Sequence, residues 1–291
     1  MLPIRCPLCE GDVSATVATL PRAGREFTVR ECAACAHRFT HPVPAPEDFA
    51  LFYDDDAAYQ AFRTERRSGR SALYVWLRDL RLRHRARVMT RRAGKPGRCL
   101  EFGCGMGDFL LALRERGWDV VGIEPSARAA EACRQKGLDV TQGADPALAQ
   151  GPFDLIVLWH VIEHVPDPVS TLKSLRGLLA DDGLLAIAMP NLDSLDAKHY
   201  APEHWFGTDV PRHLQHFTQR SMRALCARLG WRTESTWRQL YDPWQYALFS
   251  ERGWLPLRLA KAAAVGTAAW AWGVVRPLAA PCSCLFLRKE S

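Results

Sequence analysis

One stretch of this chain constrains its fold more than any other: CLEFGCGMGDFLLALRERGWDVVGIEPS, residues 99–126. An apolar strand runs into a glycine-rich turn, a helix follows, and a second apolar strand ends in an acid. Gly103, Gly105 and Gly107 allow a sharp turn and let a ligand approach the backbone closely. Glu124 ends the second strand, where a carboxylate can accept hydrogen bonds from ribose hydroxyls. The stretch therefore predicts a site for an adenosine-containing ligand.

The chain beyond this stretch keeps alternating short apolar strands with helices. Such alternation predicts an α/β fold: a Rossmann-like, mostly parallel sheet with helices on both faces. The segment PCSCLFLRKE near the C-terminus alternates like a final strand, which we expect to be antiparallel. The other predicted strands cover 98–102, 119–124, 138–142, 153–159, 183–190 and 231–237.

The first forty residues contain two cysteine pairs, CPLC and CAAC, separated by a segment that reads as a hairpin. Each pair is a tight turn that can direct two sulfurs at one tetrahedral ion, so the pattern predicts a small zinc ribbon with a structural zinc. The alternative is four unrelated, redox-active thiols. Four sulfurs complete a closed site, so we expect His37 and His41 to lie at the surface. The predicted zinc ligands are Cys6, Cys9, Cys32 and Cys35.

Composition shifts divide the chain into three consecutive parts. The proline-rich HPVPAPEDF ends a zinc-ribbon-like module at 1–45, and a linker with a basic helix follows at 46–95. The remaining part, 96–291, is the α/β domain, with an apolar helical insertion at about 253–280. Residues 63–98 hold thirteen Arg or Lys against two acids. This basic segment fits a phosphate, nucleic-acid or anionic-lipid surface, or a solvated helix face.

The stretch AAAVGTAAWAWGVV, residues 262–275, is uncharged. It is shorter than the roughly 20 apolar residues that span a bilayer, which favours a buried or interfacial helix. The N-terminus lacks a signal-peptide pattern, and ten cysteines without an export signal favour metal ligands and buried thiols over disulfides. We therefore expect a cytoplasmic protein, with peripheral contact at the inner face of the cell membrane left open.

The residues around the glycine turn separate two candidate ligands, NAD and S-adenosylmethionine. Dinucleotide sites use GxGxxG with a helix N-terminus facing the pyrophosphate, whereas GCGMGD places Asp108 there. Glu101, just before the turn, adds a second acid. Carboxylates repel a diphosphate but suit a sulfonium with an ammonium group. The expected ligand is therefore a cation.

Three motifs carry a family resemblance: ExGCGxGxFL with VxGxExS, then FDLIVLWHVIEHVPDP, then DDGLLAIAMPN. Over residues 96–240 the chain resembles the class I S-adenosylmethionine-dependent methyltransferases. The resemblance implies that the glycine turn wraps the methionine part of the cofactor and that the acid ending the second strand binds ribose. It further implies an adenine contact from Asp145, while Trp159 forms an apolar wall over the methyl group or packs in the core. The implied cofactor-binding residues are Glu101, Gly103, Cys104, Gly105, Gly107, Glu124, Pro125, Asp145 and Trp159.

A narrower resemblance rests on EHVPDP, HWFGTDVPRHLQHFT and the cysteine module. It is to bacterial methyltransferases with an N-terminal zinc-binding domain, some of them in pathways for polysaccharides, sugars or secondary products. EHVPDP is also similar to the O-methyltransferases of ubiquinone biosynthesis. The resemblance implies O- or C-methylation of a small-molecule, sugar or lipid-linked acceptor, and leaves open a Glu–His metal site for a catecholic substrate. Ala36 departs from the ribbon pattern, which often has glycine there.

A hydroxyl acceptor also needs a general base, and histidine titrates near neutrality. His213 in PRHLQHF is the first candidate for a base or substrate contact, and His160, directly after a strand, is the second. Both follow the carboxyl ends of strands, the edge at which open α/β sheets bind ligands. We expect His164 to brace a loop and His216 to pack.

Two other functions remain as alternatives. An RNA methyltransferase would use the ribbon and the basic helix, but RNA binding favours aromatic residues among the basic ones, and 63–98 offers only Tyr74 and Trp76. A non-catalytic S-adenosylmethionine-binding protein is disfavoured by the intact glycine turn and the histidine-rich loop. The acid after the turn argues against a nicotinamide dehydrogenase.

Overall fold

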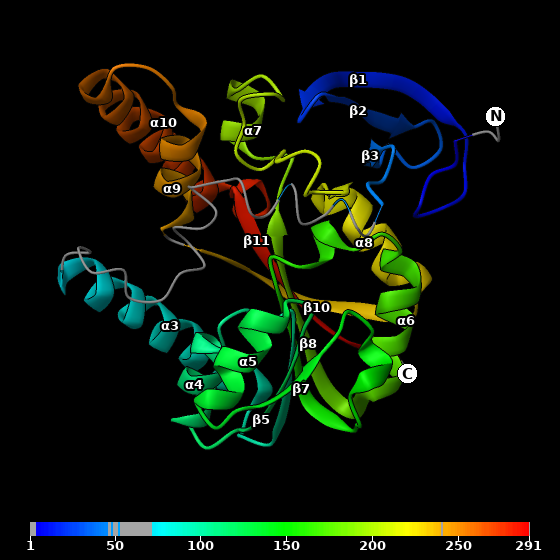
Figure 1. The fold of residues 1–291 in the computed structure, drawn as a ribbon, viewed down its shortest axis with the longest axis vertical. Coiled ribbons are helices and arrows are strands. Elements are labelled where there is room, and N and C mark those ends of the chain that lie inside the picture. Colours follow the sequence, from blue (N-terminus) through cyan, green and yellow to red (C-terminus); the bar gives the residue numbers. More distant parts are fainter. Residues whose placement is uncertain (1–3, 46–47, 49–51, 53–71, 240, 291) are drawn as a thin grey trace. The chain divides into compact units, whose positions relative to one another are not determined.

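The computed structural model describes residues 4–45, 48, 52, 72–239 and 241–290 (Figure 1). Residues 63–71 of the basic segment, and most of the predicted linker, lie outside the described residues. The chain forms two compact units. Unit 1 combines residues 1–52, 160–169 and 188–286, and unit 2 combines 53–159, 170–187 and 287–291. This division follows contacts in space, so it differs from the consecutive ranges 1–45, 46–95 and 96–291, which stay predictions.

Unit 1 contains an antiparallel sheet in the order β1-β2-β3-β9. Its first two strands form the expected hairpin, and their two-residue turn has positive φ at Ala23 (48°) and Gly24 (72°). Such a turn matches the twist of the two strands. The last strand of the sheet comes from much later in the chain. The strands are β1 (Val13–Arg22), β2 (Arg25–Cys32), β3 (Arg38–His41) and β9 (Gln215–His216).

The pairing of β3 with β9 overturns the prediction that His37 lies at the surface. His37 is fully buried: its Nε2 lies 3.0 Å from Gln215 Oε1, and its ring lies 5.0 Å from that of Phe217. Burial lowers the pKa of His37 to about 4, although the contact with Gln215 acts in the opposite direction. His41 is half-buried. The prediction failed because it treated the cysteine module without the strand that covers it.

The second sheet of the described residues has seven strands in the order β10-β11-β8-β7-β4-β5-β6. The pairs β4–β5, β4–β7 and β5–β6 are parallel, and β11 is the antiparallel C-terminal strand. The predicted Rossmann-like sheet is thereby confirmed. The strands are β4 (Arg98–Phe102), β5 (Asp119–Glu124), β6 (Asp139–Gln142), β7 (Phe153–Trp159), β8 (Leu179–Pro190), β10 (Trp231–Arg238) and β11 (Cys282–Lys289).

In unit 2, β4 and β7 are buried along almost their whole length, as expected of parallel strands covered on both faces. Figure 1 shows α4 and α5 on one side of these strands and α6 on the other. The Ser126 side chain caps α5 by accepting a hydrogen bond from Ala129 N. The helices are α3 (Ala72–Ala93), α4 (Asp108–Arg114), α5 (Ala127–Gln135) and α6 (Pro168–Leu178). Fully buried core residues of unit 2 include Leu100, Leu110, Leu113, Ile123, Leu155 and Ile156.

The apolar insertion of unit 1 is a helical hairpin of α9 and α10, and α9 was not expected from the sequence. The inward positions of α10 are all small: Ala262, Gly266, Ala269 and Gly273. A side chain at Gly266 would meet Trp244 of α9 at 2.7 Å, so glycine permits the close packing. None of the described helices combines the length and the apolarity needed to cross a bilayer. The remaining helices are α7 (Leu195–His199), α8 (Gln219–Arg228), α9 (Asp242–Ser250) and α10 (Leu255–Val275).

Candidate functional site

The glycine turn of unit 2 joins β4 to α4 with its backbone open on one side. Gly105 has φ +54°, and a Cβ built on it would meet no atom within 4 Å. Gly107 has φ +75°, and a Cβ there would lie 2.5 Å from Leu138 Cδ1. The turn thus needs glycine at Gly107 for packing, whereas at Gly105 it leaves room for a ligand against the backbone.

Glu124 ties the ends of β4 and β5 together. Its Oε2 accepts a hydrogen bond from Gly105 N (2.8 Å), and its Oε1 accepts one from Ser126 N (2.9 Å). The side chain is buried. A carboxylate can accept about four hydrogen bonds in all, which is the capacity that contacts with ribose hydroxyls in addition to these would need.

Glu101 supplies the negative character of this site. It is buried, and its Oε2 has no hydrogen-bond partner among the described residues. Burial raises the pKa of its carboxyl well above the ordinary value, and the charges of Cys133, Glu124 and Asp108 add to this. A buried acid with an unmet acceptor fits a cationic ligand, since a cation would both bond it and favour its ionised form.

Asp108 contributes less than the sequence suggested. As the first residue of α4, it pairs with Arg78 (Nη2 to Oδ2, 3.2 Å) and with Lys136 (Nζ to Oδ1, 3.3 Å). Two cations therefore offset its charge. The preference for a cationic ligand consequently rests on Glu101 rather than on Asp108.

The other residues of unit 2 that were predicted from the sequence to bind the ligand lie at separate positions. Cys104 is buried with its sulfur over Gly122, where a Cβ would lie 2.7 Å from it, so any contact of Cys104 with a ligand would come from its backbone. Asp145 is exposed and caps a short 3-10 helix through Ala147 N (2.9 Å). Pro125 is exposed between Glu124 and the cap of α5.

Trp159 is half-buried at the end of β7. The guanidinium carbon of Arg85 lies 4.3 Å from the centroid of its ring, and the ring of Phe109 lies 6.0 Å away. Arg85 also favours the ionised form of Glu101. Arg85 could not be singled out from the sequence, because it is one of many arginines on α3.

In unit 1, three histidines gather around the buried carboxyl of Glu163. His160 Nδ1 lies 3.2 Å from Glu163 Oε1, and the ring of His164 meets that of His213 edge-on at 4.7 Å. Burial acts to raise the pKa of Glu163, but the hydrogen bond from His160 and the charges of the three histidines outweigh it and lower the pKa. The lowered pKa keeps the Glu163 carboxyl ionised although it is buried.

The histidines of this cluster differ in their backbone contacts. His164 Nδ1 lies 2.8 Å from Arg212 O, so His164 braces a loop as expected, and burial lowers its pKa to about 4. His213 Nδ1 lies 2.8 Å from Gly207 O. A neutral His213 then carries its proton on Nδ1, which leaves the lone pair on Nε2 to accept another. His216 is buried, with Nε2 2.9 Å from Thr40 Oγ1, in agreement with its expected packing role.

The four N-terminal cysteines converge on one point in unit 1. The sulfur of Cys6 lies 3.7 Å from that of Cys35, and the sulfur of Cys9 lies 3.5 Å from Cys32 and 3.4 Å from Cys35. These separations are too long for disulfides and match the edges of a sulfur tetrahedron around zinc. Ala36 has φ 55°, which explains why a glycine is common at this point of a ribbon.

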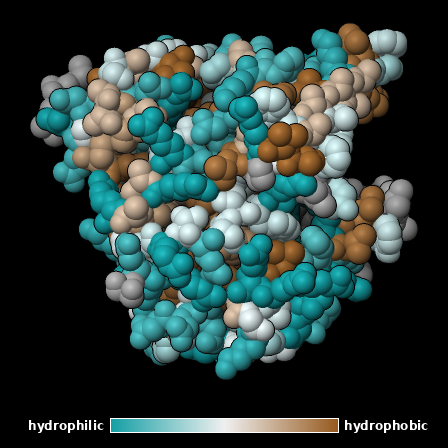
Figure 2. Space-filling view, turned by 180° about the vertical axis from the view of Figure 1, so that it is seen from behind, coloured by the Kyte–Doolittle hydropathy of each residue, from teal (hydrophilic) through white to brown (hydrophobic). Residues whose placement is uncertain are grey.

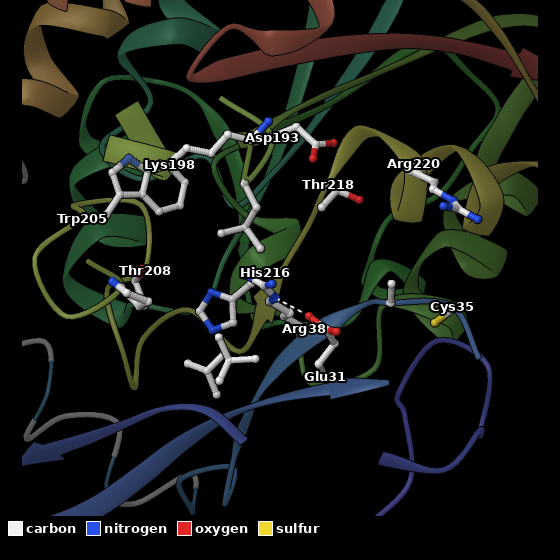
Figure 3. Close-up of a pocket in the computed structure, with 16 residues that line it drawn as sticks. Glu31, Cys35, Arg38, Asp193, Lys198, Trp205, Thr208, His216, Thr218 and Arg220 are labelled. Atoms are coloured by element: carbon white, nitrogen blue, oxygen red, sulfur yellow. Dashed lines mark hydrogen bonds and ion pairs between the residues drawn. The ribbon is translucent and has the colours of Figure 1, made fainter. Parts of the chain in front are cut away.

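A cavity of about 510 Å³ lies in unit 1 between the cysteine module and the chain that follows β8 (Figure 3). Trp205, Val17 and Val29 give it an apolar wall. Among the residues that the structure describes, Lys198 and Arg220 have no acidic partner, whereas Arg38 pairs with Glu31 at 2.7 Å. The cavity therefore suits an anionic group attached to an apolar body.

Residues 74–236 match the sequence pattern of a family described as the methyltransferase domain. This match covers more than half of the chain and includes the glycine turn, Glu124 and the histidine cluster around Glu163. The chain belongs to the class I S-adenosylmethionine-dependent methyltransferases. The resemblance found in the sequence motifs is thereby confirmed.

Curated relatives of this methyltransferase include two named ubiquinone biosynthesis O-methyltransferase. The relative from Caulobacter sp. (strain K31) is 33% identical over 105 residues, which are 32% of this chain and 41% of the relative. The relative from Methylococcus capsulatus is 34% identical over 111 residues, 35% of this chain and 46% of the relative. The chain thus spans less than half the length of these relatives.

Solved structures share the fold of this methyltransferase. The 1,6-didemethyltoxoflavin-N1-methyltransferase of Burkholderia thailandensis, solved with S-adenosylhomocysteine, has a TM-score of 0.53 and 16% identity over 94% of this chain and 98% of its own. The magnesium protoporphyrin IX methyltransferase of Synechocystis has a TM-score of 0.51 and 13% identity over 85% of this chain and 99% of its own. At these identities the likeness concerns the fold alone.

The raised pKa of Glu101 predicts that cofactor binding depends on pH. A bound ammonium group favours the ionised acid, so binding releases a proton, and affinity for S-adenosylhomocysteine should rise with pH through the raised pKa of Glu101. Glu101→Gln should bind more weakly and lose this dependence. Calorimetric titrations at several pH values, below the pH at which the ligand's amine loses its proton, would measure both.

Asp139→Asn, at an exposed acid of β6 in the same unit, is the matched control for this experiment, because Asp139 is not among the groups that shift the pKa of Glu101. It should keep the wild-type pH profile. Identical profiles for the wild type and Glu101→Gln would contradict the role assigned to Glu101.

Proposed function

We propose that this protein transfers a methyl group from S-adenosylmethionine to an oxygen atom, or alternatively a carbon atom, of a small-molecule, sugar or lipid-linked acceptor. The buried Glu101 carboxyl beside the open Gly105 turn is the observation that carries the proposal. The names of the curated relatives, which are O-methyltransferases, support oxygen as the acceptor atom.

The donor side of the proposal uses residues of unit 2. Glu101 would meet the ammonium group, Glu124 with Pro125 the ribose, and Asp145 the adenine. The turn from Gly103 through Gly107 would hold the methionine part against its backbone, and Trp159 would form an apolar wall near the methyl group.

S-adenosylmethionine supplies an already activated methyl group, so the chain's main tasks are alignment and exclusion of water. A hydroxyl acceptor must also lose its proton. We propose that His213 takes this proton at Nε2, since its Nδ1 is held by Gly207 O. His160 is the second candidate, with Nδ1 held by Glu163. A Glu–His metal site at Glu163 of the kind the resemblance leaves open stays a prediction.

The acceptor is best identified by transfer of labelled methyl from S-adenosylmethionine into a cell extract that has been separated into lipid-linked glycan, small-metabolite and RNA fractions. We expect label in the small-metabolite or lipid-linked fraction. The cavity of unit 1 leads us to expect an acceptor with an anionic group, such as a phosphate or carboxylate. Label in RNA alone would replace the proposal with an RNA methyltransferase, and no label in any fraction would favour a binding protein without turnover.

The role of His213 can be separated from cofactor binding. His213→Ala should lower turnover about 100-fold or more, the usual contribution of a general base. Affinity for S-adenosylhomocysteine should stay within a few-fold. The exposed His199→Ala is the control and should match the wild type in both. Unchanged turnover in His213→Ala would transfer the role to His160 or remove the base from the mechanism.

We propose that Cys6, Cys9, Cys32 and Cys35 hold one structural zinc. Their mutual distances and all-sulfur chemistry fit a closed tetrahedral site. Cys32→Ser should lower the zinc content by about one ion per chain and destabilise the module formed by β1, β2 and β3, because zinc binding and folding of such modules are coupled. Elemental analysis and thermal unfolding would measure this. Cys226→Ser, at a buried cysteine of α8, is the control; equal zinc content in Cys32→Ser and the wild type would refute the site.

We propose that the protein is cytoplasmic and contacts anionic lipid through the outer face of α10. Large apolar side chains stand exposed on and beside this helix, and Figure 2 shows apolar residues at the surface on the side where α10 lies. Between Glu251 and Glu290 the sequence has six basic residues and no acid. The arginines of α3 add positive charge to unit 2. The most exposed apolar residues of this face are Trp254, Leu255, Leu257 and Val275.

Co-sedimentation with liposomes tests this contact. Binding should require anionic lipid and fade as salt rises, because each Lys or Arg near the surface contributes about 1 kcal/mol that salt screens. Leu257→Glu should weaken binding, whereas Leu148→Glu, at an exposed leucine of unit 2, should not. Protein that stays in the supernatant with anionic vesicles at low salt would rule the contact out.

A further inference from the structure

A second group of metal-ligating side chains meets in unit 1, apart from the four zinc-ribbon cysteines. His160 follows β7, Asp242 begins α9, and Cys282 begins β11, yet their ligand atoms all lie within 4.8 Å of one another. His160 Nε2 lies 3.6 Å from Cys282 Sγ. Asp242 and Cys282 are buried, and the His160 side chain is 32% exposed. We propose that these three residues bind a divalent metal ion of borderline softness, with zinc the first candidate.

The donor chemistry favours such an ion. One thiolate, one imidazole and one carboxylate provide three protein ligands, the number found in zinc sites that keep a further position open. Sulfur and nitrogen donors select zinc, cobalt or iron over magnesium or calcium, which prefer oxygen. The partly exposed side of His160 gives an ion or a small ligand a route in, because the other two residues are buried.

Neighbouring side chains support the three ligands as they do in known metal sites. His160 Nδ1 lies 3.2 Å from Glu163 Oε1, which fixes the ring and leaves Nε2 to coordinate. Metal-ligating histidines commonly make such a carboxylate contact. On the other side, Gln239 Nε2 donates a hydrogen bond to Cys282 Sγ at 3.1 Å, a contact that favours a thiolate.

The backbone of His160 has an unusual conformation. Its φ is +55°, in the left-handed region that residues with a side chain adopt infrequently. The hydrogen bond from His160 N to Ala188 O at 2.9 Å fixes this conformation. It directs the imidazole between Glu163 and Cys282, so backbone strain and ligand geometry point to the same site.

The metal site stands independently of methyl transfer. If the proposed function also holds, an ion with an open position would bind an acceptor oxygen and lower the pKa of its hydroxyl. An ion bound at Nε2 would also remove His160 as the second candidate for the base. These consequences, unlike the site itself, rest on the proposed function.

Metal stoichiometry and cobalt spectroscopy on the full chain test the site. Wild-type protein titrated with Zn²⁺ should bind about two ions per chain, one of them in the zinc ribbon. Cys282→Ser and the isosteric Asp242→Asn should each lose the second ion and keep the first. Titration with Co²⁺ should give a thiolate-to-cobalt charge-transfer band. The contribution of the second ion to this band should be absent in Cys282→Ser.

Two further variants keep the test sharp. Cys284→Ser, at a buried cysteine two residues along β11, should retain both ions, which separates ligand loss from damage to the strand. Glu163→Gln leaves the three ligands in place and should weaken binding of the second ion about 10- to 100-fold. Equal metal content in the wild type and Cys282→Ser would overturn the proposal, as would a single ion in the wild type. If the wild type binds both ions but transfers no methyl group, this result would count against the proposed function and not against the metal site.

Discussion

The carboxylate of Glu124 is the contact on which the donor site depends. It ends β5 and bonds both to the glycine turn after β4 and to the backbone that starts α5. The carboxyl ends of two adjacent parallel strands, β4 and β5, are therefore held together, and the glycine turn is fixed beside them. This bridge adds to the backbone hydrogen bonds that Gly103 N and Cys104 N donate to Ile123 O, and it holds Gly105 so that its backbone presents a defined surface.

The burial of Glu101 follows from the same arrangement. It lies one residue before the end of β4, so the strand that positions the glycine turn also places an acid inside the protein. Burial disfavours the charged form of Glu101 in the free protein, whereas a bound cation would favour that form. We expect the site to discriminate against a diphosphate through Glu101, because the charge of Asp108 is already offset by Arg78 and Lys136.

Local patterns in the sequence predicted much of this structure. Buried parallel strands leave continuous apolar runs, and the glycine turn and the cysteine pairs depend on residues close together in the chain, so the sheet, the hairpin and the donor turn were foreseeable. Contacts between distant segments were not. The pairing of β3 with β9 buried His37, and small residues on α10 that pack on α9 gave no periodic signal of large side chains.

The candidate site shows the same limit. Glu101 and Glu124 could be named from motifs, whereas Arg85 and the meeting of His160 with Asp242 and Cys282 required the fold. These residues have ordinary surroundings in the sequence. His160, Asp242 and Cys282 lie far apart in the chain, so only the fold of unit 1 shows that their side chains meet.

Calorimetric titration of the full chain with S-adenosylhomocysteine and, separately, with NAD tests the central claim most directly. The account predicts heat of binding for S-adenosylhomocysteine and none for NAD. Binding should be lost in Gly105→Arg, whose side chain would occupy the open space before the turn, and weakened in Glu124→Ala. Strong NAD binding without heat from S-adenosylhomocysteine would contradict it.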